Sequence, residues 1–256
     1  MQILLFGTTG QVATELQRNT HKSIEIRALG RDEADLSKPD ICAKIIAENS
    51  ADVIINAAAY TLVEQAEIEK ALANTINGES PGRMAVAAAS RDIPFIHIST
   101  DYVFDGHGKE SWKPEDECNP LNAYGRSKLN GEEGVCASGG SYVILRTSWV
   151  FSAYGQNFVK TMLYLSKKHN TLRIVEDQIG GPTAASDIAK TCLIIAQALY
   201  SGREVSGTYH FSGSPDVSWA DFAREIFAQT ERTTIVENIS TSDSPTAVKR
   251  PLNSRM

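Results

Sequence analysis

"QILLFGTTGQVATEL", residues 2–16, places a short apolar run directly before a glycine-rich turn and an amphipathic stretch. This order predicts a buried strand, a tight turn and a helix. Gly7 permits the turn, Gly10 lets the backbone approach a pyrophosphate, and Ala13 is small enough for helix and strand to pack closely. Since such a turn also serves as an ordinary strand-to-helix corner, the rest of the chain must decide its meaning.

Short apolar runs continue to alternate with amphipathic stretches over the first 150 residues. We expect strands at residues 2–6, 24–29, 53–56, 95–99 and 143–148, and helices at residues 11–19, 40–49, 64–74, 78–91 and 123–137. Strands that are apolar along most of their length, such as VIIN at 53–56, are typical of parallel sheets covered on both faces. Right-handed crossovers then predict an α/β fold, a Rossmann-type doubly wound parallel sheet.

The pattern changes after about residue 150. We expect residues 1–150 to form a dinucleotide-binding Rossmann domain, to which later strands and helices return, and residues 151–256 to form mainly a smaller C-terminal substrate-binding lobe. Expected elements are helices at 157–168, 186–200 and 218–230, with Ser218 as an N-cap, and strands at 171–175 and 207–213. The polar stretch 105–122 predicts a functional loop. The ending KRPLNSRM does not resemble the end of a packed element, so a lobe that continues further is left open.

Composition excludes several classes of protein. The net charge is -6 and no run of Lys and Arg suggests a nucleic-acid or membrane partner. No apolar run approaches the roughly 20 residues that span a bilayer, and the N-terminus does not resemble a signal peptide. The four cysteines are scattered without metal-ligand spacing. We therefore expect a cytoplasmic protein with reduced thiols.

The turn after the second expected strand suggests which dinucleotide binds. Gly30 and Arg31 follow Leu29, and an arginine at this place suits the 2′-phosphate of NADPH. Asp32 stands beside it, so NADH remains the alternative cofactor. The remaining expected contacts are those of the helix N-terminus with the phosphates and those near the adenine: Gly7, Thr9, Gly10, Gln11, Val12, Asp35 and Leu36.

A tyrosine and a lysine stand four residues apart in NAYGRSK, residues 122–128. Tyr124 and Lys128 would share one face of a helix. A nearby ammonium favours the phenolate, so we expect Lys128 to lower the pKa of Tyr124 from its usual value of about 10. Tyr164 and Lys168 repeat the spacing, so spacing alone does not identify a site.

Taken together, the motifs resemble the extended short-chain dehydrogenase/reductase family. Within it, the chain is similar to the subgroup that reduces the 4-keto group of dTDP-4-dehydro-L-rhamnose. The matching stretches are ILLFGTTGQVATEL, DVIINAAAYTLVEQAE, IHISTDYVFDG, NAYGRSKLNGE, LRTSWVF, NFVKTML, DQIGGPT and RPLNSR. Of these, STDYVFDG and RTSWVF are the most specific to the subgroup, and the glycine motif is the least specific.

The resemblance implies a catalytic group of Thr100, Tyr124 and Lys128. Tyr124 would protonate the keto oxygen as the nicotinamide supplies hydride, Thr100 would hydrogen-bond the same oxygen, and Lys128 would also hold the ribose. Tyr164 lacks a strand-end partner of this kind, so we interpret it as a surface residue. Further cofactor contacts implied by the resemblance are Ala57, Ala58, Tyr60 and Asn77.

The resemblance also implies which residues contact the substrate. Tyr102 stands where related dehydratases carry a glutamate, which favours carbonyl reduction over dehydration, and Asp101 would be a hydrogen-bond anchor. Thr61, Val63 and Trp149 would border the sugar, although a core role for Trp149 stays open. Arginine suits a diphosphate, and the residues expected toward the substrate nucleotide are Gly181, Pro182, Thr183, Arg250 and Arg255. A solvated tail is the alternative for the two arginines.

Some members of the family form a magnesium-bridged dimer through glutamates. Glu15 is present here, but Ser186 stands where an acidic residue is expected, so we predict no metal site. A homodimer remains compatible with the sequence. Two other functions also stay open: a non-catalytic regulatory subunit resembling that of methionine adenosyltransferase, and another nucleotide-sugar reductase, epimerase or dehydratase.

Overall fold

A six-stranded parallel sheet forms the centre of the computed structural model, which describes residues 1–19, 23–244, 246 and 248–256. The strand order is β10-β5-β4-β3-β1-β2, and every neighbouring pair is parallel. The strands are β1 (Gln2–Phe6), β2 (Glu25–Leu29), β3 (Val53–Asn56), β4 (Phe95–Thr100), β5 (Tyr142–Thr147) and β10 (Gly207–His210). The predicted doubly wound Rossmann-type sheet is therefore confirmed.

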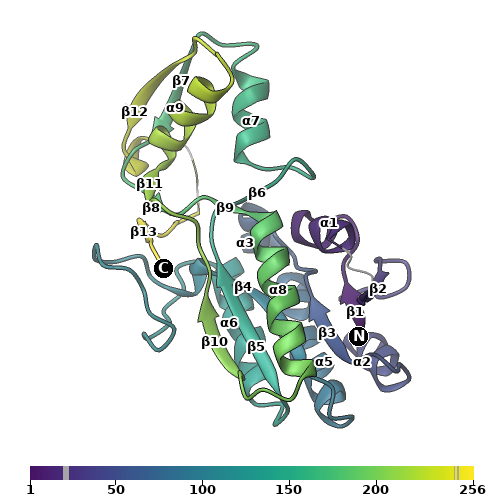
Figure 1. Ribbon diagram of the computed structural model, residues 1–256. Helices are drawn as coiled ribbons and strands as arrows, with labels where there is room; N and C mark the ends of the chain where they lie inside the picture. The colour runs from purple at the N-terminus through teal and green to yellow at the C-terminus, as the bar shows by residue number, and fades with distance from the viewer. Residues whose placement is uncertain (20–22, 245, 247) are drawn as a thin grey trace.

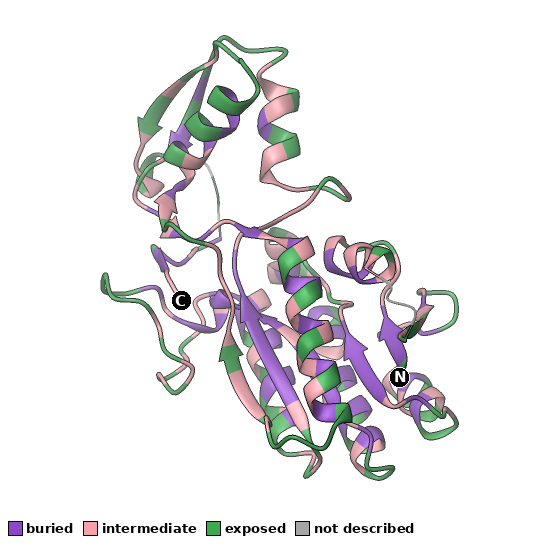
Figure 2. Cartoon of the chain, viewed as in Figure 1, coloured by how far each residue is buried: buried purple, intermediate pink, exposed green. Residues whose placement is uncertain are grey.

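Helices cover both faces of this sheet (Figure 1). Successive residues of a strand point to opposite faces, so Leu4 packs against one helical layer and Leu5 against the other. The first layer contains α2 (Pro39–Ala47), α5 (Ser80–Ala89) and α6 (Ala123–Cys136), and the second contains α1 (Gln11–Arg18) and α8 (Ala185–Tyr200). Figure 2 shows the central strands of the sheet buried and the outer helix faces exposed.

One predicted helix is divided, and another begins later than expected. The stretch 64–74 splits into α3 (Val63–Ile68) and α4 (Lys70–Asn74), because Glu69 leaves the helical conformation at φ -103° and ψ 46°. A π-helical turn, η1 (Thr75–Glu79), then precedes α5. Pro81 lies in the first turn of α5 and has no N–H to donate to a preceding carbonyl, which explains why the regular pattern is interrupted there.

A smaller lobe stands beyond one edge of the sheet (Figure 1). Its core lies between helices α7 (Phe158–Leu165) and α9 (Trp219–Gln229) and the parallel strands β7 (Thr171–Val175) and β12 (Ile235–Ile239). Ser218 caps α9 as predicted, since its Oγ accepts from the Asp221 N–H at 3.0 Å. Short segments complete the lobe and its junction: β6 (Val150–Phe151), β8 (Ile179–Gly180), β9 (Thr183–Ala184), β11 (Val217–Ser218), β13 (Asn253–Ser254), η2 (Asp101–Val103) and η3 (Thr241–Asp243).

The long segment 105–122 forms no helix or strand, although all of its residues are described. A buried ion pair between Arg146 and Glu132, 2.7 Å long, lies beneath it. Arg146 also donates to the Pro114 carbonyl at 3.1 Å, and the Trp112 N–H donates to the Arg255 carbonyl at 2.9 Å. The segment thus joins the sheet to the C-terminal end of the chain.

Candidate functional site

The turn between β1 and α1 forms a cradle of backbone. Gly7 has a φ of +110°, and a Cβ at this position would lie 3.4 Å from the Ala57 carbonyl carbon and the Ala58 nitrogen. Gly10 caps α1 without any side-chain hydrogen bond to the first turn, which leaves backbone N–H groups to bind an anion. These features fit the pyrophosphate of a dinucleotide.

The side chains around this cradle are mostly committed to the protein. Gln11 donates to the Val150 carbonyl at 3.3 Å and accepts from Asn157 at 2.9 Å, and Val12 is buried in the core. Gln17 donates to the Thr8 carbonyl at 2.9 Å, which fixes the turn. Any contact of this turn with phosphate would therefore come chiefly from backbone N–H groups.

Arg31 extends from the carboxyl end of β2 into solvent. Its side chain is 77% exposed and its Nε lies 3.9 Å from Asp35 Oδ1. The Ser37 N–H donates to Asp35, and this bond, together with the charge of Arg31, outweighs burial and lowers the pKa of Asp35. Leu36 is buried in the core, so its side chain does not face this surface. Arg31 is thus an exposed cation at this end of the cradle, with only a long contact to Asp35.

Thr100, Tyr124 and Lys128 come together where β4 ends against α6. Asn122 caps α6 by accepting from the Gly125 N–H at 2.8 Å. A Cβ on Gly125 would lie 2.2 Å from the Tyr102 carbonyl oxygen, so only glycine lets α6 approach η2 this closely. As a result the rings of Tyr102 and Tyr124 meet edge to face with centroids 5.5 Å apart.

The pKa of Tyr124 shifts in the opposite direction to the one predicted, although the phenol is protonated in both cases. Burial raises the pKa of Tyr124 to about 12, against a lowering contribution from the hydrogen bond with Thr100. Lys128 does not offset this rise, because its Nζ donates to the Ile98 carbonyl at 2.7 Å and lies 3.2 Å from His97 Nε2. The prediction that Lys128 lowers this pKa is wrong for this arrangement, and the phenol is protonated near neutral pH.

Asp101 is buried beside the catalytic candidates. Thr100 Oγ1 donates to Asp101 Oδ1 at 3.0 Å and accepts from the Tyr102 N–H at 3.2 Å. Burial raises the pKa of Asp101 to about 6 despite these bonds. The carboxylate orients the Thr100 hydroxyl, which is the role of an anchor.

Asn77 connects the loop after β3 to α6. Its Oδ1 accepts from the Tyr60 N–H at 2.8 Å, while its Nδ2 donates to the Tyr60 carbonyl at 2.9 Å and to Ser127 Oγ at 3.0 Å. These bonds occupy the amide, so Asn77 acts on the site by fixing the position of the loop. Ala57 and Ala58 lie in that loop beside the Gly7 turn, and Thr61 is exposed just beyond it.

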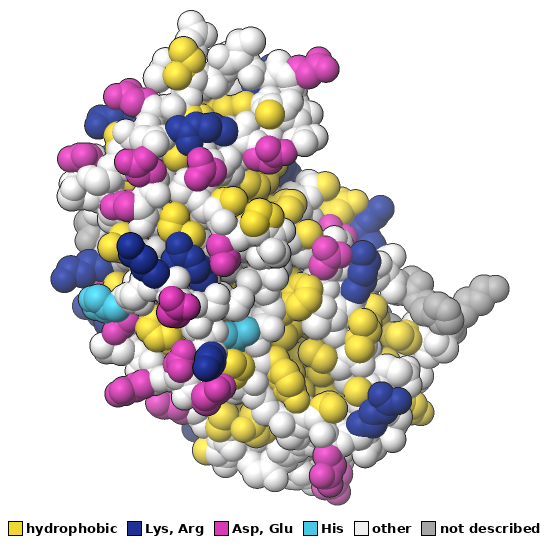
Figure 3. All heavy atoms as spheres, turned by 60° about the vertical axis from the view of Figure 1, so that its left-hand side comes forward, with side chains coloured by type: hydrophobic (Ala, Val, Ile, Leu, Met, Phe, Trp, Pro, Cys, Tyr) yellow, Lys and Arg dark blue, Asp and Glu magenta, His cyan; other side chains and the backbone are white. Residues whose placement is uncertain are grey.

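A cavity of about 730 Å³ lies in the smaller lobe. Its lining includes Phe158, Arg173, Gln178, Trp219 and Arg250. Trp219 Nε1 donates to Gln178 Oε1 at 3.2 Å. Figure 3 shows Lys and Arg side chains gathered on the face where this lobe meets the larger domain. An aromatic wall with arginines suits a nucleotide, whose base can stack and whose phosphates attract guanidinium groups.

Trp149 packs against Trp219, one of the residues that line this cavity. Its ring stacks on Trp219, with centroids 3.5 Å apart and planes 8° from parallel. Its backbone has a φ of +49°, unusual for a bulky residue, at the exit of β5. Sequence reasoning selected Trp149 and missed Trp219, for which the only signal was an aromatic residue directly after the Ser218 cap.

The other candidates for the substrate side divide into two groups. Arg250 lines the cavity and forms an ion pair with Glu64 of α3. By contrast, Gly181 and Thr183 are packed at the junction, where a Cβ on Gly181 would lie 2.1 Å from the Gly213 carbonyl oxygen. Pro182 lies between them. Arg255 donates to Asn253 Oδ1 at 2.9 Å and is not among the lining residues.

Tyr164 and Lys168, the second pair with the same spacing, lie on the surface of the smaller lobe. Tyr164 is 56% exposed, and the Lys168 ammonium sits over its ring, 4.3 Å from the centroid. This position agrees with the interpretation of the pair as a surface feature. Identical spacing therefore occurs once in a buried cluster and once on an open helix face.

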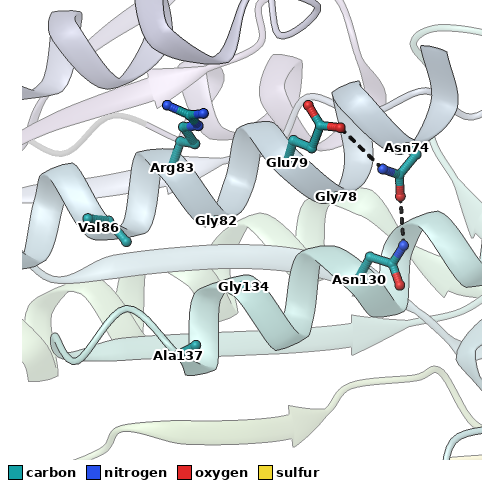
Figure 4. Close-up of a pocket in the computed structure, with 9 residues that line it drawn as sticks. All are labelled: Asn74, Gly78, Glu79, Gly82, Arg83, Val86, Asn130, Gly134 and Ala137. Carbon is teal, nitrogen blue, oxygen red and sulfur yellow. Dashed lines mark hydrogen bonds between the residues drawn. The ribbon is translucent and has the colours of Figure 1, made fainter. Parts of the chain in front are cut away.

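A second hollow lies on the outer side of α5 and α6, away from the catalytic cluster. Gly78, Gly82 and Gly134 line it together with the exposed Val86. Figure 4 shows Asn74 at one end, hydrogen-bonded to Glu79 and Asn130. The glycines bring the two helices close, which leaves a shallow groove between them.

The described residues contain neither a metal-binding cluster nor a membrane-spanning helix. No group of three or more His, Cys, Asp or Glu residues there could hold a metal ion. Glu15 accepts from Ser152 Oγ at 2.7 Å, and Asp187 pairs with Lys190 at 2.9 Å. No described helix combines the length and apolarity needed to cross a membrane.

Comparison with known proteins gives a consistent result. The family model of the RmlD substrate binding domain matches residues 1–256. The dTDP-4-dehydrorhamnose reductase of Sinorhizobium fredii is 41% identical over 262 residues, which cover 100% of this chain and 88% of that protein. The dTDP-4-dehydrorhamnose reductase of Escherichia coli K12 is 37% identical and is covered to 89%. A crystal structure of the Bacillus anthracis dTDP-4-dehydrorhamnose reductase in complex with NADP has a TM-score of 0.94 and 34% identity, with 99% of this chain and 89% of that chain covered.

Proposed function

Because the chain belongs to the family of the RmlD substrate binding domain, we propose that it reduces the 4-keto group of dTDP-4-dehydro-L-rhamnose, with NADPH, to dTDP-L-rhamnose. The observation that carries this proposal is that Thr100, at the end of β4, and Tyr124, on α6, lie together beside the loop that borders the Gly7 cradle. Full-length similarity to reductases of this substrate supports the same reaction.

Each of the three catalytic candidates has a distinct task. NADPH, when bound, supplies the hydride. Tyr124 is protonated at neutral pH, since burial raises its pKa to about 12, and it therefore has a proton to give to the keto oxygen. Thr100 donates its one hydroxyl proton to Asp101 in this structure, and would turn that hydroxyl toward the keto oxygen to hydrogen-bond it. Lys128 stabilises the phenolate that remains after proton transfer, provided that it is an ammonium at that moment.

The cofactor and substrate would approach the cluster from opposite sides. We assign the pyrophosphate to the backbone of Gly7, Thr9 and Gly10 and the 2′-phosphate to Arg31, which is exposed at the end of β2. The cavity of the smaller lobe would take the thymidine diphosphate. Arg250 would bind the diphosphate, because it both lines the cavity and lies near Tyr102.

The direct test is turnover by the purified full chain. We expect NADPH oxidation that depends on dTDP-4-dehydro-L-rhamnose, with one dTDP-L-rhamnose formed per NADPH consumed. Binding of NADPH without turnover by the folded protein would favour the regulatory-subunit alternative. Product formed without net consumption of cofactor would favour an epimerase.

Two properties of the protein extend this proposal. We also propose a homodimer, and the groove between α5 and α6, which the exposed Val86 lines, is the surface on which to test it. Light scattering of wild type and of Val86→Lys would test it, since a dimer formed there would dissociate in the variant.

A cytoplasmic location is supported by the free thiols of all four described cysteines and by the use of NADPH.

A further inference from the structure

We propose that Asn122 is a positioning residue that holds Arg250 in place relative to α6, the helix that carries Tyr124. One amide then sets the distance between the group that binds the diphosphate and the group that protonates the sugar. The part of this inference that concerns substrate binding rests on the function proposed for Arg250. The contact itself is a property of the folded protein and can be measured without substrate.

Asn122 makes two hydrogen bonds in different directions. It is 1% exposed and lies at the start of α6. Its Oδ1 accepts from the Gly125 N–H at 2.8 Å, which caps the helix. Its Nδ2 donates to the Lys249 carbonyl at 2.9 Å, 127 residues further along the chain. These partners fix the orientation of the amide, because an N–H pairs only with its oxygen and a carbonyl only with its nitrogen.

Capping alone does not require an asparagine. Ser, Thr and Asp also cap helices well. A serine or threonine, however, has no second polar group that could reach Lys249, and an aspartate would place a carboxylate oxygen against its carbonyl. Only the amide combines an acceptor for α6 with a donor for the C-terminal segment. The second bond therefore explains why asparagine suits this position.

The Lys249 carbonyl directly precedes Arg250 in the chain, so its position affects the arginine. Pro251 follows Arg250 and restricts that residue to extended backbone conformations. On the far side, the Leu252 carbonyl accepts from the Ile179 N–H at 2.8 Å. The backbone is therefore anchored on both sides of the arginine.

Helix α3 makes a second connection between the same two elements. Glu64 pairs with Arg250, and Glu67, one turn later, accepts from the Ala123 N–H at 2.6 Å. Since α6 has no acidic residue in its first turn, Glu67 provides the negative charge that a helix N-terminus favours. This bond is the main cause that lowers the pKa of Glu67. The start of α6 and Arg250 are thus joined twice, through Asn122 and through α3.

The two connections differ in strength. The Glu64 side chain of the ion pair is 54% exposed, and pairs open to water are weak constraints. The amide of Asn122 is buried, where a hydrogen bond is electrostatically stronger. Arg250 lines the cavity, and its Nε is buried without a hydrogen-bond partner among the described residues. Loss of the Asn122 bond should therefore displace a guanidinium group that is directed at the ligand.

The first test is hydrogen exchange of wild type and of Asn122→Ser without any ligand. Serine keeps the helix cap and removes the bond to Lys249. The N–H groups of Ile179 and Asn253, which bond across the C-terminal segment, should exchange roughly 10-fold faster, while the Gly125 N–H keeps its protection. Unchanged exchange at Ile179 and Asn253 would overturn the proposal. Because no turnover is needed, this result is independent of whether the proposed reduction is correct.

The second test is a double-mutant cycle with Arg250→Ala, in which calorimetry measures the binding of dTDP. Asn122→Ser alone should raise the Kd for dTDP about 3- to 10-fold, the range expected for the loss of one hydrogen bond. In the Arg250→Ala background it should raise the Kd by less than about 2-fold, because the group that it positions is gone. Equal factors in both backgrounds would show that Asn122 does not act through Arg250 and would overturn the inference.

Steady-state kinetics separate positioning from capping. In Asn122→Ser the KM for the dTDP-sugar should rise by a larger factor than kcat falls, since the cap of the helix that carries Tyr124 is kept. Asn122→Asp is the matched variant, because it also keeps the cap but repels the Lys249 carbonyl, so its KM should rise at least as far. A fall in kcat with an unchanged KM in both folded variants would assign Asn122 to the cap alone and refute the proposal.

Discussion

Arg250 and Glu64 form an ion pair that joins the C-terminal segment to α3. The Arg250 side chain is only 29% exposed, and its Nε is buried without a hydrogen-bond partner. An unsatisfied buried donor is costly, and a diphosphate oxygen is an acceptor that would satisfy it.

Arg250→Ala should therefore weaken substrate binding more than it slows the chemical step. Loss of a hydrogen bond to a charged group costs about 1.5–3 kcal/mol, which corresponds to a rise in KM of roughly 10- to 100-fold. Steady-state kinetics with the dTDP-sugar, at saturating NADPH, measure this change. Arg255→Ala is the matched control, and an equal effect of both substitutions would argue against a specific contact of Arg250.

Tyr124→Phe should remove the proton donor and leave the cofactor cradle unchanged. General acid catalysis contributes about 10²- to 10⁴-fold, so kcat should fall by that factor while the Kd for NADPH stays within a few-fold of wild type. Tyr164→Phe provides the control with the same spacing to a lysine, on an exposed helix face. If the two variants retained similar activity, Tyr124 would not be the acid.

The contrast between these tyrosines shows what the sequence could predict. Alternating apolar and amphipathic segments were sufficient for the six-stranded architecture, because each buried strand and covering helix has its own local period. Tyr124 and Lys128 were found through motif context, since spacing alone matched Tyr164 equally well. The break at Glu69 was missed. The strand Ile235–Ile239 was missed as well, because its pairing partner β7 is distant in sequence.

The contacts and pKa values of the site residues were harder to predict from the sequence than the identity of those residues. Lys128 stands one turn from Tyr124, which suggested that it lowers the tyrosine pKa, but its Nζ meets His97 and the Ile98 carbonyl. In the sequence His97 is indistinguishable from an ordinary strand residue. Only the fold shows that it lies beneath α6, beside Lys128. Likewise, Trp219 gains meaning only when the chain brings it onto Trp149. Such contacts are set by tertiary packing, which no local pattern encodes.

Arg31→Ala should change the choice of cofactor. Arg31 is the exposed cation at the end of β2, and its loss removes a charged contact with the 2′-phosphate that NADH does not possess. We expect the KM for NADPH to rise about 10-fold or more and the KM for NADH to change little. Parallel titrations with the two cofactors measure the ratio. An equal change for both would assign the 2′-phosphate to another group.

Asp101 should make stability depend on pH. Burial raises the pKa of Asp101 from 3.8 to about 6, so the folded state binds this proton more tightly than the unfolded state does. The stabilisation is fully present below the unfolded pKa of 3.8 and is lost as the pH rises through about 6. A shift of about two units corresponds to about 3 kcal/mol of unfolding free energy.

Asp101→Asn isolates this contribution, because the amide keeps an acceptor for Thr100 Oγ1 and does not titrate. Urea unfolding of both proteins at about pH 4 and about pH 7 gives the difference directly. Between these values wild type should lose about 2 kcal/mol more than the variant, because about pH 4 is not yet below the unfolded pKa and every other titrating group is common to both. Equal losses in the two proteins would mean that folding does not raise the pKa of Asp101, and that the Thr100 hydroxyl is oriented by a charged anchor near neutral pH.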